Sequence, residues 1–327
     1  MLRVAFIGAG QMARLHLHAV QSLAGGSAVV GIQDRVRDRA NDLADIARTR
    51  AYDSIDRLIE EARPDVVHVC TAPEAHLDAA RAALTGGAHT YVEQPFARRL
   101  SDARSLIDLA RSQRLIVCAG HELLRDPAFE RLMARVDSLG QIVQVDSEFA
   151  LSPARMNVRG ASTSVLARTL MEVLPYPLYA LVSVLERLGD PECPIALEWV
   201  HAGPTDVQAV LSCGSLTGRL NVSLRARPVA SSLTVRGTRS ALTCDFLRSV
   251  VVGAGNPGSA PIEQLLNPII EGVQLAARTT RSLLGRLRAK STHPGLVESI
   301  GSFHQAVQEG GPSPVSPAHL LRVTELF

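Results

Sequence analysis

The sequence predicts an α/β fold class, in which a doubly wound parallel sheet precedes an α+β domain with a largely antiparallel sheet. Three observations predict it. An apolar run over 4–7 leads directly into a glycine-containing turn and a helical pattern. Strand and helix patterns then alternate as far as residue 119, which is typical of parallel sheets. Short apolar runs separated by Gly, Pro and Ser follow between residues 196 and 252, as in an antiparallel sheet.

The first element is a strand, turn and helix of the dinucleotide-binding type. The apolar run Val4–Ile7 ends at a turn with the sequence GAGQMA at 8–13. Gly8 permits a tight turn, Gly10 has no Cβ to keep a pyrophosphate from the backbone, and Ala13 lets the helix pack close to the strand. The free N–H groups at the helix start face the phosphates. We therefore assign four residues of this turn to cofactor binding: Gly8, Gly10, Gln11 and Met12.

The second strand ends near a carboxylate suited to a ribose. The run Ala28–Ile32 leads to Asp34, about 20 or more residues beyond the glycines, where a carboxylate accepts hydrogen bonds from an adenosine ribose. Because strand, helix and carboxylate agree, a Rossmann-type site is favoured over an ordinary turn. Arg35 would stack on adenine or, with Arg37 and Arg39, pair with a 2′-phosphate, which Asp34 would repel. We expect NAD(H) as the cofactor, with NADP(H) as the alternative.

The alternation continues over residues 40–119. Helical patterns over 40–47, 54–62, 74–84 and 101–112 alternate with apolar runs at 66–70, 89–92 and 115–119. After His121 a helix is expected from Asp126 to Leu139, then a long strand over Ile142–Phe149. Further strands are expected over 196–200, 207–213, 216–224, 233–236, 241–246 and 250–252. We place the boundary near Gly120, with a dinucleotide-binding domain over 1–120 and a substrate-binding and oligomerisation domain over 121–327.

Composition limits the classes of function. With 327 residues, 46% of them hydrophobic, the chain is long enough for two cores and is not disordered. Its formal charge of +2, without a basic run interleaved with aromatic residues, predicts no nucleic-acid partner. No apolar stretch approaches the roughly 20 residues of a membrane span, and Met1 lies too close to the first strand for a signal peptide, so we expect a cytoplasmic protein. Five scattered cysteines without C-x-x-C spacing predict reduced thiols and no metal site.

Four motifs occur in a specific order: the glycine turn at 8–13, TAPEAH at 71–76, EQP at 93–95 and GHELLR at 120–125. With them the chain resembles, over essentially its whole length, the Gfo/Idh/MocA oxidoreductases, which include glucose-fructose oxidoreductase and inositol dehydrogenases. The resemblance implies that Glu93 and Gln94 lie beside the nicotinamide and that Arg125 faces the active cleft. It also implies that four residues line the nicotinamide half of the cofactor: Thr71, Ala72, Pro73 and His76.

The first departure from that family is at Gln94. Family members typically carry Glu-Lys-Pro, where the lysine is taken to bind substrate and assist proton transfer, but this chain has Glu93-Gln94-Pro95. A lysine near a positive nicotinamide can exchange a proton because its pKa falls, whereas an amide only donates and accepts hydrogen bonds. The one lysine of the chain, Lys290, is far away in the sequence. Gln94 is therefore a candidate catalytic residue that would orient a substrate oxygen.

The second departure is in Met171–Tyr179, which resembles the family's Asp-x-Gly-x-His-x-x-Asp segment. In that register Glu172 replaces the first Asp, Tyr176 the catalytic His, and Tyr179 the second Asp. On one helix these three positions share a face and could point into one cleft. Tyr176 is a candidate general base, although the ordinary phenol pKa of about 10 must fall for neutral-pH work. The alternative is that Tyr176 and Tyr179 are partly buried packing residues.

Several histidines, Arg125 and the segment 262–290 each have a functional and a structural interpretation. His121 and Arg125 would bind an anionic or hydroxyl-rich substrate, or else form a salt bridge between domains. His16 and His18 lie on the first helix, where surface or packing roles are favoured over chemistry. Residues 262–290 form an apolar helical pattern that ends in basic residues. This segment is either a membrane-surface helix or, as we favour from sequence alone, an insertion that packs on a partner subunit with a solvated basic face.

Together these features predict an NAD(P)-dependent oxidoreductase that transfers hydride between a sugar-like or cyclic polyol substrate and the nicotinamide. The cofactor carries the electrons, so hydride transfer survives without the lysine, and Tyr176 or a water would move the proton. One alternative is redox-neutral elimination or epimerisation with retained NAD. Another is a non-catalytic nucleotide-binding protein, since the Lys, His and Asp equivalents are all replaced. An exposed face of the second sheet predicts a homo-oligomer.

Overall fold

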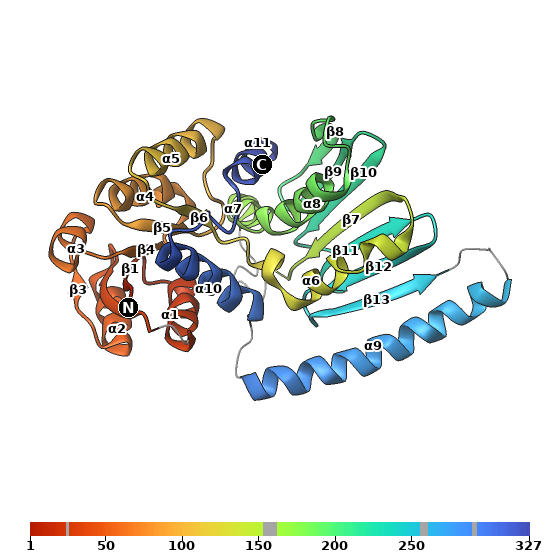
Figure 1. Ribbon diagram of the computed structural model, residues 1–327, viewed down its shortest axis with the longest axis horizontal. Coiled ribbons are helices and arrows are strands. Elements are labelled where there is room, and N and C mark those ends of the chain that lie inside the picture. The colour runs from red at the N-terminus through yellow and green to blue at the C-terminus, as the bar shows by residue number, and fades with distance from the viewer. Residues whose placement is uncertain (24–25, 153–161, 256–260, 290–292) are drawn as a thin grey trace. The chain divides into compact units, whose positions relative to one another are not determined.

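Two units divide the chain, and the first contains both of its ends. The computed structural model describes residues 1–23, 26–152, 162–255, 261–289 and 293–327. One unit consists of Met1–Glu122 together with Gly295–Phe327, and the other of Leu123–Pro294 (Figure 1). The sequence assigned all of 121–327 to a second domain. That assignment is wrong for the C-terminal segment, because its two helices pack into the core of the first unit.

The first unit contains a six-stranded sheet of parallel strands in the order β3-β2-β1-β4-β5-β6. These strands are β1 Arg3–Ile7, β2 Ala28–Gln33, β3 Ala51–Tyr52, β4 Val66–Val69, β5 His89–Val92 and β6 Val117–Ala119. Their near-continuous apolar sequences are typical of strands that helices cover on both faces. The predicted doubly wound parallel sheet is confirmed. The sequence missed only β3 among these strands, which is too short to show a period.

Helices join these strands and cover the sheet. They are α1 Gln11–Ser22, α2 Arg37–Ala47, α3 Ile55–Ala62, the 3₁₀ turn η1 Pro73–Ala75, α4 His76–Thr85, α5 Leu100–Ser112, α10 Pro294–Glu309 and α11 Pro317–Leu326. Ser54 starts α3, since its hydroxyl accepts the Arg57 N–H at 3.3 Å. Ser316 starts α11 in the same way, with its hydroxyl 3.2 Å from the His319 nitrogen. Each hydroxyl satisfies a helix-start N–H that lacks an intrahelical partner.

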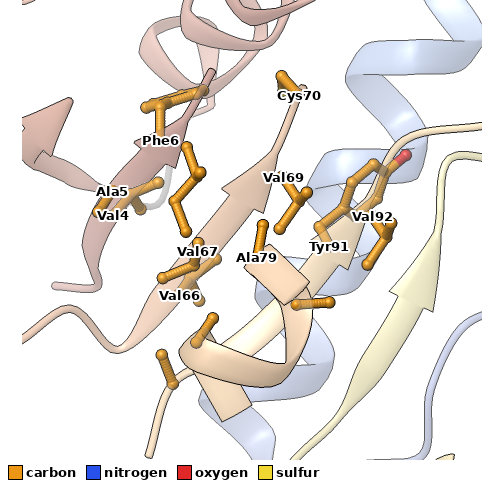
Figure 2. Close-up of a cluster of buried hydrophobic side chains, with 14 of the residues drawn as sticks. Val4, Ala5, Phe6, Val66, Val67, Val69, Cys70, Ala79, Tyr91 and Val92 are labelled. Atoms are coloured by element: carbon orange, nitrogen blue, oxygen red, sulfur yellow. The ribbon is translucent and has the colours of Figure 1, made fainter. Parts of the chain in front are cut away.

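The core of the first unit lies between the sheet and its helices. Figure 2 shows β1, β4 and β5 placing Phe6, Val67 and Tyr91 among other buried side chains. The returning helix α10 joins this core, because the Tyr91 hydroxyl lies 2.9 Å from the Ser299 hydroxyl and the Tyr91 and Phe303 ring centroids are 5.4 Å apart. α11 packs against α5. These contacts explain why the end of the chain belongs to the first unit.

The second unit contains a seven-stranded sheet in the order β13-β12-β11-β7-β10-β9-β8. Its strands are β7 Ile142–Ala150, β8 Ala196–Ala202, β9 Asp206–Cys213, β10 Leu216–Ser223, β11 Ala230–Gly237, β12 Ser240–Asp245 and β13 Val250–Gly255. β7 pairs with β10 in parallel, and the other described pairs are antiparallel. The predicted, largely antiparallel sheet is confirmed.

The described helices of the second unit are α6 Pro127–Met133, η3 Val136–Leu139, α7 Thr163–Val173, α8 Pro175–Leu188 and α9 Pro261–Ala289, and the turn η2 Glu122–Arg125 leads into them. The helix expected from Asp126 to Leu139 is therefore two shorter elements. Residues Thr163–Leu188 are apolar and long enough to cross a membrane by length and composition. However, 61% of the most apolar window is buried, and α8 packs on β7 and β10. This segment is a core helix pair.

Candidate cofactor site and active-site residues

The glycine turn leaves room for a ligand at one glycine and none at the other. Gly8 has a φ of +97°, and a Cβ there would lie 2.4 Å from the carbonyl oxygen of Cys70, so only glycine fits. At Gly10, by contrast, a Cβ would meet no described protein atom within 4 Å. Gly10 is also the N-cap of α1 and brings no side-chain cap. The N–H groups of Gln11 and Met12 are therefore available to an anion such as a pyrophosphate.

Asp34, just after β2, fixes the glycine turn. Its Oδ2 accepts the Ala9 N–H at 2.7 Å, and its Oδ1 accepts the Val36 N–H at 2.8 Å. Each carboxylate oxygen keeps a further lone pair, so a ribose hydroxyl can still bind there. The neighbouring Arg35 side chain is exposed. Asp34 and the glycine turn thus lie together at the carboxyl edge of the first sheet, where doubly wound sheets bind ligands.

The loops after β4 and β5 lie at the same edge, and His76 joins them. The His76 side chain is buried, with Nδ1 2.8 Å from the carbonyl oxygen of Pro95 and Nε2 3.1 Å from that of Thr71. His76 is therefore a positioning residue for both loops. Thr71, Ala72 and Pro73 are half-buried or exposed, so they stay accessible to a cofactor.

Gln94 presents an amide nitrogen without a partner at this edge. The residue is only 8% exposed, and its Nε2 has no hydrogen-bond partner in the described part of the chain. A buried donor without a partner costs about 1–3 kcal/mol, which an acceptor oxygen on a ligand would recover. The backbone N–H of Gln94 donates to Glu93 Oε2 at 3.1 Å. Glycine at 120 makes space for that carboxylate, because a Cβ there would lie 2.9 Å from Glu93 Oε1.

A chain of buried hydrogen bonds leads away from Glu93. His16 Nε2 lies 2.6 Å from Glu93 Oε1, and His16 Nδ1 lies 3.0 Å from His68 Nδ1. His68 Nε2 lies 3.0 Å from His304 Nε2, and His304 Nδ1 lies 3.1 Å from the half-buried Ser27 hydroxyl. We call these five residues the histidine chain. It joins α1, β4, the end of β5 and α10 inside the first unit.

The sequence did not predict the histidine chain. It assigned His16 to a surface or packing role and singled out neither His68 nor His304. His16 and His68 are 52 residues apart, and His68 and His304 are 236 residues apart. They meet through strand order and the return of α10, which spacing cannot show. The sequence offered one indication of a buried polar contact, which is the position of His68 inside the apolar strand Val66–Val69.

Burial and neighbouring charges set different pKa values along the chain. Burial lowers the pKa of His16, but Cys70 and Glu93 together outweigh it and raise that pKa to about 10. Burial also raises the pKa of the Cys70 thiol, so Glu93 is the charged partner of His16 at neutral pH. Burial raises the pKa of Glu93, but the His16 contact outweighs this and lowers it overall. Burial lowers the pKa of both His68 and His304, the latter to about 4.

These values describe an ion pair between His16 and Glu93 that continues into two neutral rings. With both His16 nitrogens donating, His68 accepts at Nδ1 and donates from Nε2, and His304 accepts at Nε2 and donates from Nδ1 to Ser27. Each ring can take a proton on one nitrogen and release one from the other. A proton released from His16 Nδ1 can therefore pass through His68 and His304 toward the half-buried Ser27 hydroxyl.

His121 and Arg125, both predicted to bind substrate, belong to different units. His121 is 1% exposed, and its ring lies edge-on to His319 of α11 with the centroids 5.1 Å apart. Burial and then the charge of His319 hold the pKa of His121 well below its ordinary value, so the ring is neutral. These contacts favour packing over a substrate contact for His121. Arg125 is half-buried at the end of η2.

The three candidate catalytic residues of the second unit lie on two helices. Glu172 is on α7, whereas Tyr176 and Tyr179 are on α8. Pro175 begins α8 and has no N–H to continue the hydrogen bonds of α7. Leu174 between the two helices nevertheless keeps a helical backbone, with its N–H 2.9 Å from the Leu170 carbonyl oxygen, so the helical path continues from α7 into α8.

The two tyrosines differ in their surroundings. Tyr179 is fully buried, and its hydroxyl accepts the Leu123 N–H at 3.1 Å. Tyr176 is half-buried, with its ring 6.4 Å from that of Phe149 and 6.0 Å from that of Tyr179. The packing interpretation suits Tyr179, while Tyr176 keeps the partial exposure that a catalytic group requires.

The edge of the first sheet fits a dinucleotide. An open glycine and helix N–H groups suit a pyrophosphate, the Asp34 carboxylate suits a ribose, and the unpaired Gln94 amide suits a ligand oxygen. Among the residues that the structure describes, no group of three or more His, Cys, Asp or Glu is arranged to hold a metal ion.

Comparison with known families agrees with this site. Residues 2–121 match the model of the Gfo/Idh/MocA oxidoreductase family, which has an NAD-binding Rossmann fold. Over this region the chain is similar to that family, and the resemblance seen in the motifs is confirmed. The predicted nicotinamide dinucleotide cofactor agrees with the match.

Relatives and solved structures extend the likeness. UDP-N-acetylglucosamine 3-dehydrogenase from Acidithiobacillus ferrooxidans is 32% identical over 131 residues, which is 40% of this chain and 40% of that protein. Its structure is similar over 99% of this chain and 95% of its own, with a TM-score of 0.73 at 19% identity. The chain thus matches about two fifths of this curated relative in sequence, whereas the fold is shared along nearly the whole chain.

Two ligand-bound structures share the fold as well. One is a 3-ketoreductase from Actinomadura kijaniata in complex with NADP and TDP-benzene, at a TM-score of 0.77 and 18% identity over 99% of this chain and 95% of that one. The other is a dehydrogenase from Bordetella pertussis in complex with NADH and UDP-GlcNAcA, at a TM-score of 0.77 and 12% identity over 99% and 93%.

Proposed function

We propose that this protein is an NAD(P)-dependent oxidoreductase that transfers hydride to or from a sugar-like substrate, with nucleotide-linked sugars as the first class to test. The glycine turn carries the proposal. No residue larger than glycine fits at position 8, whereas the space beside Gly10 at the start of α1 is open to a ligand. The unpaired Gln94 amide supports it. So do the three named relatives, which act on or bind nucleotide-linked molecules.

Asp34 favours NAD(H) over NADP(H). Ala9 and Val36 hold its carboxylate in place, and a fixed negative charge would repel a 2′-phosphate. Fluorescence titration should give tighter binding of NADH than of NADPH. Asp34→Asn, which removes the charge and keeps an oxygen for the Val36 N–H, should narrow that difference. Tighter NADPH binding by the unchanged chain would contradict the preference.

When bound, the nicotinamide supplies or accepts the hydride, so this chain's residues need only orient the substrate and move a proton. Gln94 Nε2 would donate to the substrate oxygen at the reacting carbon. An amide cannot take up the proton that this oxygen releases during oxidation. Tyr176 or a water would be one acceptor. The histidine chain gives a second route, in which the Glu93 carboxylate takes the proton and His16 in turn releases its Nδ1 proton to His68, toward His304 and Ser27.

A substrate panel tests the proposal. The full chain would be incubated with NAD⁺ or NADH and UDP-linked, TDP-linked and free sugars and inositols, and followed by nicotinamide absorbance. We expect turnover of at least one substrate, and none for Gly10→Val, whose side chain fills the phosphate position. His68→Gln keeps a hydrogen-bonding side chain but cannot pass on a proton. Its turnover should be slower than that of the unchanged chain, and its solvent isotope effect should be larger. Silence on every substrate by a chain that binds NADH would overturn the proposal.

Gln94 favours a second candidate, a family member that binds the cofactor without oxidising a substrate. The lysine that typically stands there is absent, so the usual proton transfer is lost. Gln94→Lys combined with Tyr176→His distinguishes the two. New activity from an inert parent supports the second candidate, whereas loss of rate from an active parent supports the first. Product analysis by NMR would reveal elimination or epimerisation, which proceed without net NADH.

A further inference from the structure

Helix α9 turns its apolar side away from the protein. Five large apolar side chains are exposed by more than half, at Ile262 (64%), Leu265 (71%), Ile269 (63%), Val273 (65%) and Leu283 (57%). At the helical spacing of 3.6 residues per turn these positions share one side of the helix. With 29 residues, α9 is about 43 Å long. Lys290, which follows it, lies outside the described residues.

Polar side chains on the other side of α9 fix this orientation. Gln274 accepts the Gly253 N–H at 3.2 Å and donates to the Gly253 carbonyl at 3.1 Å. Arg278 donates to the Val251 carbonyl, and the Ser282 hydroxyl donates to the Arg248 carbonyl at 2.6 Å. Gln274, Arg278 and Ser282 are four residues apart, so they form one line along the helix. β13 is the edge strand of its sheet, and α9 lies along it in Figure 1. Pairing with this edge holds the apolar side of α9 outward.

Four arginines line a cavity beside α9. The cavity has a volume of about 640 Å³, and the described residues that line it include Arg131 of α6, Arg135 just after α6, Arg278 and Arg281 of α9, and Ser249, but no carboxylate. Arg131 donates to the Ser249 carbonyl at 2.8 Å. None of the four arginines forms an ion pair within the described ranges. Burial and then the charges of Arg135 and Arg131 lower the pKa of Arg278, as expected for cations without a counter-charge.

We propose that α9 and the arginine cavity form a surface that binds membranes containing anionic lipids, with a headgroup phosphate as the ligand of the cavity. The apolar side of α9 would enter the boundary between headgroups and acyl chains, where amphipathic helices with basic residues lie. Arginine is suited to phosphate because its guanidinium donates two parallel hydrogen bonds.

Charge favours a membrane over a second copy of the chain. Residues 261–289 contain Glu263 and Glu271 but four arginines, all in the C-terminal half. In a two-fold interface through α9, each copy would bring its own uncompensated arginines to the contact, and these would repel. An anionic bilayer offers the opposite charge and an apolar layer together.

Vesicle flotation of the full chain tests the proposal. We expect binding to phosphatidylcholine vesicles that contain about a third phosphatidylglycerol, and at least 10-fold weaker binding to pure phosphatidylcholine. The triple variant Leu265→Gln, Ile269→Gln, Val273→Gln should lose most of the binding. Arg281→Gln should weaken binding to the anionic vesicles, whereas Arg111→Gln, an exposed arginine of α5, removes the same charge elsewhere and should not. NADH binding and circular dichroism would verify that each variant is folded.

Three outcomes would overturn the proposal. The first is no binding to anionic vesicles by a folded chain. The second is an α9-dependent dimer in light scattering, which the triple variant converts to a monomer while vesicles remain unbound. The third is arginine-dependent binding of inorganic phosphate by calorimetry without vesicle binding, which would make the cavity a site for a soluble anion.

Discussion

α1 and α9 are both amphipathic, yet they turn opposite sides toward the protein. α1 buries Ala13, Leu17 and Val20 in the core of the first unit, and its polar positions other than His16 face outward. α9 uses Gln274 and Arg278 to bind the edge of β13, and its apolar residues face outward. Periodicity thus identifies both helices. What each helix packs against decides which side is buried, and an unpaired strand edge selects polar side chains.

The polar contacts of the two helices should differ most in their contribution to stability. Glu93→Ala removes the buried partner of His16 on α1, so the free energy of unfolding of the first unit should fall by about 3–5 kcal/mol. Gln274→Ala on α9 should cost the second unit about 1 kcal/mol. Urea denaturation measures both, with circular dichroism for the whole chain and fluorescence of the single tryptophan, Trp199 in β8, for the second unit. Equal losses of unfolding free energy in Glu93→Ala and Gln274→Ala would contradict the expected difference between the two helices.

The apolar side chains of α1 and α9 should differ nearly as much in their contribution to the free energy of unfolding. Leu17→Ala leaves a cavity in a closed core and should lower the unfolding free energy by about 2–5 kcal/mol. Leu265→Ala, at a residue that is 71% exposed, should change it by less than about 0.5 kcal/mol. The two substitutions are chemically identical, so each serves as the control for the other. A large loss from Leu265→Ala in a monomeric sample would mean that protein covers this side of α9.

Acid should weaken the contact between α10 and β4 inside the first unit. The pKa of His304 is about 4 in the folded chain against 6.5 ordinarily, because burial favours the neutral ring. Between these values the unfolded chain binds a proton that the folded chain does not, so stability falls as pH falls below 6.5, by about 3 kcal/mol at pH 4. Above pH 6.5 this contribution is constant.

His304→Gln cannot take up that proton. Its unfolding free energy should therefore fall less than that of the unchanged chain between pH 8 and pH 4 in urea denaturation. His18→Gln, at an exposed histidine of α1, is the control and should follow the unchanged chain. Parallel curves for all three proteins would contradict the assigned pKa of His304.

The smallest change in stability is expected where α1 begins. Gly10→Ala places a methyl group in open space, so the unfolding free energy should change by less than about 0.5 kcal/mol. NADH binding should nevertheless weaken at least 10-fold, because that space is the approach to the pyrophosphate. Gly8→Ala is the contrasting variant, since its methyl group meets the Cys70 carbonyl and should destabilise the fold itself. Unchanged NADH affinity in Gly10→Ala would place the phosphates elsewhere.

The sequence predicted what local pattern determines. The glycine turn, the parallel sheet and the position of Asp34 follow from strand and helix periods and from glycine chemistry, and each is present in the structure. The cofactor half of the candidate site was therefore accessible to sequence reasoning. So was the second sheet, because its short strands are separated by turn residues.

The parts that depend on contacts between distant residues were not accessible. His68 and His304 carry no motif, and only the return of α10 brings them together. Sequence spacing placed Glu172 and Tyr176 on one helix, and the structure divides that helix into α7 and α8 at Pro175, which has no N–H. The pattern of α9 gave the correct helix, but the outward direction of its apolar side depends on the edge of β13.

The return of α10 and α11 also bears on biosynthesis. Ile300, Phe303 and Leu320 complete the hydrophobic core around the first sheet, and Ser299 bonds the Tyr91 hydroxyl. On the ribosome, the first unit must therefore keep an open face until α10 and α11 have been translated, while residues 123–294 have already emerged. Chaperone contact during that interval, and rapid proteolysis of chains released before Gly295, are the expected cellular signs of this arrangement.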